Sequence, residues 1–205
     1  PLGAVAAAGA AGAVGTAMMV VAQAVVLRGG WSAAADPGAW ADVVATRSGS
    51  WWAARLLLLT ALATAAAVFR RRRGDPPGLP VRSAVPVAEF VAIAVALVTA
   101  LGGHAVTGRW PLVGVVATVA HLLAIGVWSA GLLSLVGPEG LRGPGDSRAD
   151  LARRFSPVAL VAVGVAAAGG LVNGARQVGL PDLLWSTTYG RVLVVKVALV
   201  ALVVP

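Results

Sequence analysis

The stretch Trp110–Pro138, WPLVGVVATVAHLLAIGVWSAGLLSLVGP, contains no charged residue and decides the fold class. A helix rises about 1.5 Å per residue, so this stretch is long enough to cross a hydrocarbon layer about 30 Å thick. Leu2–Leu27 and Phe155–Ala175 are likewise free of charge. Because lipid offers the backbone no hydrogen-bonding partners, each of these stretches is expected to form a helix that satisfies its own N–H and C=O groups.

The overall composition also indicates a membrane protein. Hydrophobic residues make up 59% of the 205 residues and charged residues 12%, whereas a soluble domain carries about 25% charged residues. We therefore expect an all-α, polytopic transmembrane helix bundle of about six spans, forming a single domain over residues 1–205. The expected spans are 2–27, 51–69, 84–104, 111–136, 156–176 and a last one from 190 that is cut short. Since the sequence starts at Pro1 and stops in an apolar run, we expect a fragment of a longer chain.

The arginines and tryptophans predict the orientation of the bundle. Nine arginines fall in the connections 70–83 and 137–155, against six spread over the opposite side. The positive-inside rule then places these two connections in the cytoplasm. The connections 28–50, 105–110 and 177–189 are expected to face outwards, and six of the seven tryptophans lie in or beside them, as in an aromatic belt.

Several function classes are disfavoured. A net charge of +8 often indicates nucleic-acid binding, but here the arginines lie at span ends, where they contact lipid headgroups of the bilayer. The sequence contains neither G-x-S-x-G, nor H-E-x-x-H, nor a Walker loop, and it has no cysteine, so the common catalytic and thiolate motifs are missing. We expect neither an enzyme nor a nucleic-acid-binding protein.

Two stretches of the sequence resemble each other. Thr46–Arg55 and Thr187–Lys196 both follow the pattern T-x-x-G-x5-[R/K], and each preceding span carries one amide, Gln23 or Asn173. Each copy puts a cation about 9 Å inside the start of a helix. We interpret the pattern as an internal repeat of the first two and last two spans, an arrangement common in transporters. Within the 28–50 connection, Asp36-Pro37-Gly38 is expected to form a turn.

The only two histidines lie on neighbouring spans, His104 at the outer end of one and His121 deep in the next. Ionisable groups within a membrane are costly, and so are functional candidates. Each histidine either packs through a hydrogen bond or serves as a metal ligand, a haem ligand or a proton relay. Their depths differ by about 10 Å, which favours two successive stations over one shared ion.

Further candidates lie on the other spans. Met18 and Met19, the only methionines, either pack or add thioether ligands, and thioether with imidazole favours copper. Glu89 either turns towards the inner surface or carries a proton or ion. Arg55 and Lys196 either reach the outer surface along their own stems or bind lipid, partner or substrate.

Polar and small residues are expected to hold the helices together. Asn173 and Gln23 are predicted to bond across helices, and Trp128 is predicted to pack below His121, seven residues away on the same helical face. Small residues at helix interfaces allow close approach. We expect this role for Gly126, Gly131, Gly164, Gly169 and Gly170.

Most of residues 46–205 resembles the CopD copper-resistance family. RFSPVAL at 154–160, GGLVN at 169–173 and TYGRVLVVK at 188–196 are similar to that family's R-F-S-x-x-A-L, T-G-x-x-N and T-x-Y-G-R-x-L-x-x-K, which adds Tyr189 and Arg191 to the candidate functional residues. The segments around His104 and from His121 to Leu132 resemble its G-H-A and H-x6-W-x-G-G-L elements. Two residues depart from the pattern, Gly169 in place of the threonine and Ala130 in place of a glycine, and neither change removes a polar ligand.

The resemblance implies a protein of the bacterial cytoplasmic membrane that takes part in copper uptake, transport or resistance. It also implies a periplasmic copper-binding partner or fused domain of the CopC type, or a fused cytochrome oxidase assembly domain. We expect His104 to be the outer copper station and His121 the inner one, with Met18 or Met19 completing a site. Two alternatives are a haem-binding electron-transfer protein, which needs two histidines at matched depth, and a scaffold for copper delivery.

Overall fold

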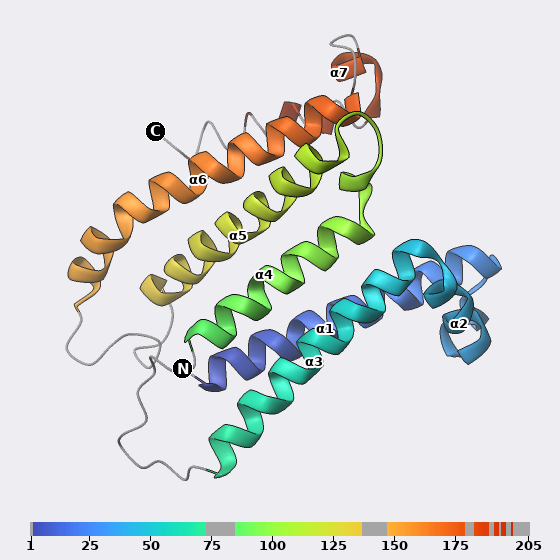
Figure 1. Ribbon diagram of the computed structural model, residues 1–205, viewed down its shortest axis with the longest axis horizontal. Coiled ribbons are helices and arrows are strands. Elements are labelled where there is room, and N and C mark those ends of the chain that lie inside the picture. The colour runs from blue at the N-terminus through green and yellow to red at the C-terminus, as the bar shows by residue number, and fades with distance from the viewer. Residues whose placement is uncertain are drawn as a thin grey trace.

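The computed structural model describes residues 2–72, 85–136, 147–178, 183–188, 191–192, 194–195 and 198. All regular structure in this part is helical. The long helices run obliquely from lower left to upper right in Figure 1: α1 Leu2–Arg28, α3 Arg47–Arg72, α4 Val85–Gly102, α5 Pro111–Val136 and α6 Arg148–Val178. Short helices lie in the connections: η1 Trp31–Ala35, α2 Pro37–Ala45, η3 His104–Val106 and α7 Leu183–Ser186.

Four of the described helices are long and apolar enough to cross a membrane. These spans are Val5–Arg28, Arg47–Phe69, Pro111–Val136 and Arg148–Gln177. Helix α4 is equally apolar in character but shorter, with its apolar part at Pro86–Gly102. The all-helical, multi-pass membrane architecture is therefore confirmed for the described part of the chain, and the last expected span, from 190, falls largely outside it.

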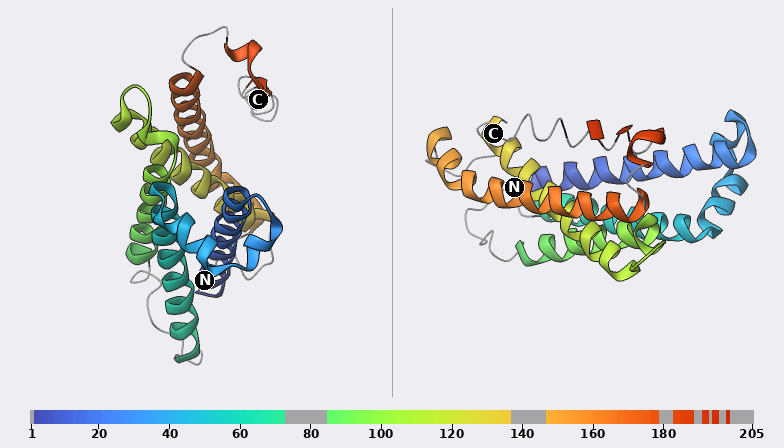
Figure 2. Two further views of the ribbon diagram at one scale, coloured as in Figure 1. Left: turned by 90° about the vertical axis from the view of Figure 1, so that its right-hand side faces the viewer. Right: turned by 90° about the horizontal axis from the view of Figure 1, so that it is seen from above.

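The long helices form two packed pairs, with one helix between them. Helix α1 packs on α3 and α5 packs on α6, while α4 contacts both α3 and α5. Successive helices run in opposite directions, so α2, η3 and α7 lie at one end of the bundle, while the start of α1 and the ends of α3 and α5 lie at the other (Figures 1 and 2). The second copy of the repeated sequence pattern includes residues 189, 190, 193 and 196, which lie outside the described part, so the internal repeat stays a prediction.

Small residues occupy the interfaces between helices. Nearly all of the buried hydrophobic residues are alanines, while most exposed large side chains point away from the bundle, such as Leu57 and Leu112. Lipid tails are as apolar as leucine, so large side chains gain nothing by leaving them, whereas small side chains let backbones approach. This distribution is the one expected of helices that pack within lipid.

The 28–50 connection consists of the short helices η1 and α2, and the turn predicted at Asp36-Pro37-Gly38 lies where α2 begins. The Asp36 carboxylate accepts a hydrogen bond from the Gly38 N–H at 2.8 Å, which makes it the N-cap of α2, with Pro37 in the first turn. Aspartate before proline is a favoured start of a helix, because the carboxylate accepts from a free N–H of the first turn and proline has no N–H to satisfy. An ion pair between Arg28 and Asp42 ties α2 to the end of α1.

Helix α3 starts at Arg47, four residues before the expected position, because Thr46 caps it. The Thr46 hydroxyl donates to the Val43 carbonyl at 2.7 Å and accepts from the Gly49 N–H at 3.0 Å. A Cβ on Gly49 would lie 1.9 Å from the Val43 carbonyl oxygen. The T-x-x-G pattern of the first copy is therefore a capping turn in which glycine makes room for backbone.

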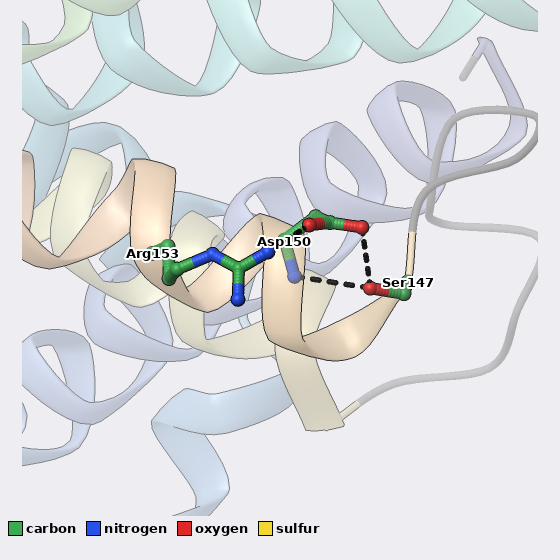
Figure 3. Close-up of polar contacts among 3 residues, drawn as sticks. All are labelled: Ser147, Asp150 and Arg153. Atoms are coloured by element: carbon green, nitrogen blue, oxygen red, sulfur yellow. Dashed lines mark hydrogen bonds and ion pairs between the residues drawn. The ribbon is translucent and has the colours of Figure 1, made fainter.

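Helix α6 starts at Arg148, eight residues before the expected position and within the predicted 137–155 connection. Ser147 accepts from the Asp150 N–H at 3.1 Å and donates to its carboxylate at 2.6 Å, and Asp150 forms an ion pair with Arg153 (Figure 3). This arrangement resembles a capping box, which stabilises a first turn through reciprocal hydrogen bonds. The helix then continues through Pro157, as transmembrane helices tolerate.

The predicted close approaches at glycine hold at some positions and fail at others. A Cβ on Gly131 would lie 2.0 Å from the Phe155 ring, and one on Gly169 would lie 2.7 Å from the Ala117 carbonyl oxygen. A Cβ on Gly170 would lie 3.3 Å from Cε1 of the His121 ring. Nothing lies within 4 Å at Gly126 or Gly164, so the prediction was wrong for those two, which face away from the neighbouring helix.

Candidate metal stations and the polar seam between α5 and α6

His121 lies half-buried in α5 against α6. Its Nδ1 lies 2.5 Å from the Ala166 carbonyl oxygen. A carbonyl can only accept, so Nδ1 carries the proton and donates, which leaves Nε2 as the ring nitrogen outside this contact. Gly169 and Gly170 on α6 provide the space for the ring. This is the orientation that metal-ligating histidines commonly have, with the second nitrogen bonded to a backbone carbonyl.

A second polar contact joins α5 and α6 one turn closer to η3. The Asn173 amide donates to the Thr118 hydroxyl at 3.0 Å, so the predicted cross-helix bond of Asn173 is confirmed. Thr118 and His121 are three residues apart on α5, and Ala166 and Asn173 are seven apart on α6, spacings that place each pair on one helical face. The two contacts therefore form a polar seam between α5 and α6.

Arg176 extends this seam to the loop that carries His104. Its Nε donates to the Arg109 carbonyl at 2.8 Å, and its Nη2 donates to the carbonyls of Thr107 at 3.0 Å and Ala105 at 3.2 Å. Its Nη1 donates to the Asn173 side-chain oxygen at 3.3 Å. One guanidinium thus joins α6 to the connection between α4 and α5.

His104 opens η3 and is exposed. Its carbonyl accepts from the Thr107 hydroxyl at 2.8 Å, which closes a tight turn. His104 precedes the start of α5, whereas His121 lies ten residues, about 15 Å, into that helix from Pro111. The two histidines are therefore at different depths of the bundle, as the sequence predicted.

The methionines lie on the other helix pair. Met18 is exposed, and the Met19 sulfur accepts a hydrogen bond from Arg55 Nη2 at 3.1 Å. Arg55 Nε also donates to the buried Thr16 hydroxyl at 3.0 Å, and Nη1 reaches Thr99 Oγ1 at 3.5 Å. Arg55 thus joins α1, α3 and α4, while His121 belongs to the α5–α6 pair. Ligation by either methionine stays a prediction.

The remaining candidates are not gathered into one site. Glu89 is exposed near the start of α4, and Trp128 is half-buried on α5. Arg191 is exposed, and its N–H donates to the Thr187 carbonyl at 3.1 Å. Tyr189 and Lys196 lie outside the described residues. Within the described ranges, no three histidine, aspartate or glutamate side chains come together as a metal cluster.

Sequence reasoning missed Arg176, Thr118 and Ala166. In the sequence, Arg176 was interpreted only as one of the cations at the span ends. Its spacing of three residues from Asn173 nevertheless places both on one face of α6. Ala166 takes part through its backbone carbonyl, and no side-chain pattern signals which carbonyl a neighbouring helix meets. The tertiary contact alone brings these groups together.

The Asn173–Thr118 contact predicts a measurable coupling. We expect Asn173→Ala and Thr118→Ala each to lower the free energy of unfolding, with a coupling energy of about 0.6 kcal/mol, the average for hydrogen bonds between transmembrane helices. The measurement is detergent unfolding of the wild type, the two single variants and the double variant. Strictly additive effects would contradict this contact.

Comparisons with known proteins agree with the resemblance stated for the sequence. The family model "Copper resistance protein D-like, N-terminal domain" matches residues 2–110, and the model "Copper resistance protein D" matches residues 149–204. "Copper transport protein CutJ" of Bacillus subtilis (strain 168) is 38% identical over 103 residues, which cover 49% of this chain and 19% of CutJ. The match thus spans about a fifth of that relative. No solved structure matches. With its N-terminal half and its C-terminal segment both matched, this multi-pass membrane protein belongs to the copper resistance protein D (CopD) family.

Proposed function

We propose that this protein carries copper through the cytoplasmic membrane of a bacterium, with copper as its cargo and no enzymatic step. His104 receives the ion at the outer surface, and His121 receives it within the bundle. The observation that carries the proposal is the His121 ring, whose Nδ1–H donates to the Ala166 carbonyl; Nε2 would then be the ligating atom. Membership of the CopD family and the printed function of CutJ, copper transport, support copper as the cargo.

The polar seam supports a path between these two stations. Arg176 and Asn173 link residues 103–110, here named the His104 loop, to Thr118, which lies three residues before His121 on α5. Elsewhere the surface of the bundle is dominated by large apolar side chains, which offer a cation no ligand. Imidazole nitrogen is a suitable ligand for copper. Met18 and Met19 lie on the other helix pair, and we assign them a secondary role near Arg55.

The proposal includes an orientation and a partner. The arginine-rich end of α3 and the arginine-rich start of α6 face the cytoplasm, and α2, η3 and α7 face the periplasm. A periplasmic copper-binding protein or fused domain of the CopC type delivers the ion to the His104 loop. The alternative of a haem protein is less well supported, because His104 precedes α5 whereas His121 lies about 15 Å into that helix, and one haem needs two ligands at matched depth.

Elemental analysis of copper-loaded protein tests the proposal. We expect the wild type to retain copper after desalting, and His121→Ala to bind it at least about tenfold more weakly, since even the outer partners of metal ligands have effects of that size. His104→Ala is expected to weaken copper binding at the outer station and to leave the binding at His121 unchanged. Val116→Ala, a change of an exposed residue on α5, serves as the matched control and is expected to bind like the wild type.

Two outcomes would contradict the metal stations. A folded wild type without copper above background would favour a scaffold for copper delivery whose histidines only pack. Equal copper content in the wild type and both histidine variants would place the ion elsewhere. Absorbance separates the haem alternative, because a b-type haem gives an intense visible band and cuprous copper gives none.

A further inference from the structure

The His104 loop, residues 103–110, rests on α4 and α5 through η3 and the buried Ala105, but most of its residues are exposed. Within the loop, η3 spans only three residues, and the Thr107 hydroxyl bonds to the His104 carbonyl. His104, Thr107, Gly108, Arg109 and Trp110 are all exposed. Such a segment is expected to open easily unless something outside it holds it.

The backbone of this loop is strained at its end. Trp110 has a φ of 51°, in the left-handed region that residues other than glycine rarely adopt. Gly108 has a φ of 77°, which glycine adopts readily. A strained residue persists only where its surroundings hold it. The carbonyl directly before Trp110, that of Arg109, accepts the shortest of the hydrogen bonds from Arg176, at 2.8 Å.

The structure assigns this restraining role to Arg176. We propose that Arg176 is a positioning residue, which holds the His104 loop in one conformation and thereby sets the affinity of the outer copper station. Its planar guanidinium presents several donors in a rigid fork and stays charged. Three of its bonds reach the carbonyls of residues 105, 107 and 109, on the two sides of the turn.

Two features of the surroundings favour this position of the guanidinium. Gly114 on α5 has no side chain, and a Cβ there would lie 1.8 Å from Arg176 Nη1. Arg176 also lies in the last turn of α6, where the helix dipole favours a positive charge. Asn173 accepts from Nη1 while donating to Thr118, so the guanidinium is oriented by the same seam that meets His121.

The consequence for the proposed function is that one helix determines the place of both histidines. Helix α6 meets His121 through the Ala166 carbonyl and the His104 loop through Arg176. The copper part of this inference rests on the proposed function. The restraint of the loop does not, so the two are tested separately.

Thiol labelling tests the restraint without copper. The chain has no cysteine, so Val106→Cys introduces a single reporter at a half-buried position of η3. We expect Arg176→Gln to speed maleimide labelling at least about tenfold, equivalent to the net contribution of one hydrogen bond to a charged group. Arg176→Lys keeps the charge but lacks the fork, and is expected to give an intermediate rate. Arg109→Gln is the matched control, because the Arg109 side chain lies over the Trp110 ring and only its backbone carbonyl meets Arg176.

Copper binding, measured without the reporter cysteine, tests the link to His104. We expect Arg176→Gln to weaken copper binding about tenfold and to have no further effect in a His104→Ala background. Circular dichroism and size exclusion verify that each variant is folded.

The outcomes separate the claims. An unchanged labelling rate in Arg176→Gln would overturn the restraint. Faster labelling with equal weakening of copper binding in the presence and absence of His104 would show a structural role alone and overturn the positioning role. A wild type that binds no copper would remove the proposed function and the copper part of this inference, while the labelling rates would still decide the restraint.

Discussion

Replacing Gly114 with alanine is expected to lower the free energy of unfolding by about 3 kcal/mol and to release the His104 loop. The added Cβ would lie 1.8 Å from Arg176 Nη1 and 2.3 Å from the Ala105 carbonyl oxygen. Arg176 can withdraw only by giving up its bonds to the loop, and the carbonyl can withdraw only by moving the loop. Either adjustment separates α6 from the segment that carries His104.

Detergent unfolding and labelling at Val106→Cys measure these two effects. The matched control is Gly126→Ala on the same helix, where an added Cβ meets nothing within 4 Å. That change is expected to be neutral or to stabilise the helix by up to about 1 kcal/mol, because alanine favours helix over glycine. Similar stability of the two variants would contradict the contact of Gly114 with Arg176.

Replacing Gly49 with alanine is expected to have an effect of similar size in the other helix pair, again about 3 kcal/mol. The added Cβ would lie 1.9 Å from the Val43 carbonyl oxygen and 2.6 Å from its carbon. These are backbone atoms, so no rotamer change relieves the overlap. Val43 is itself fully buried in a cluster with Ala24, Ala33 and Ala39, so the backbone of α2 can retreat only by opening that cluster.

The same measurement with two further variants identifies the cause. Thr46→Ala removes the hydroxyl that caps α3 and is expected to cost about 1 kcal/mol, less than the overlap at Gly49. Gly15→Ala on α1, where nothing lies within 4 Å, is expected to be neutral or slightly stabilising. If Gly49→Ala were as stable as Gly15→Ala, the close approach of α2 and α3 would be refuted.

The ends of the helices show what hydropathy alone does not predict, namely the residue at which a helix begins. The apolar stretches located α1 and α5 almost to the residue, whereas α3 and α6 begin before the apolar stretch does. Lipid requires apolar residues only within its own thickness, while a helix begins where its first N–H groups find acceptors. Thr46 and Ser147 provide those acceptors outside the apolar stretch, and the S-x-x-D pattern at Ser147 was a readable signal that had been missed.

The glycines illustrate a second limit. Gly126 and Gly131 lie on one helix and look alike in the sequence, but only Gly131 meets a neighbour, the Phe155 ring. Likewise Gly164 is open where Gly169 is in close contact. Composition identifies residues that permit close approach, and it does not state which face of the helix turns towards a partner.

By itself, the sequence determined that the chain is a bundle of transmembrane helices with two histidines at different depths, and its motifs indicated the CopD family. The helical fold follows from the sequence because, in lipid, an uncharged stretch has to pair its backbone N–H and C=O groups with one another. Only the tertiary structure decided that His121 donates to Ala166, that Arg55 meets Met19, and that Arg176 meets three carbonyls of the His104 loop. Those contacts join residues far apart in the chain through backbone carbonyls and flexible side chains, and which of them meet depends on how the helices rotate and cross.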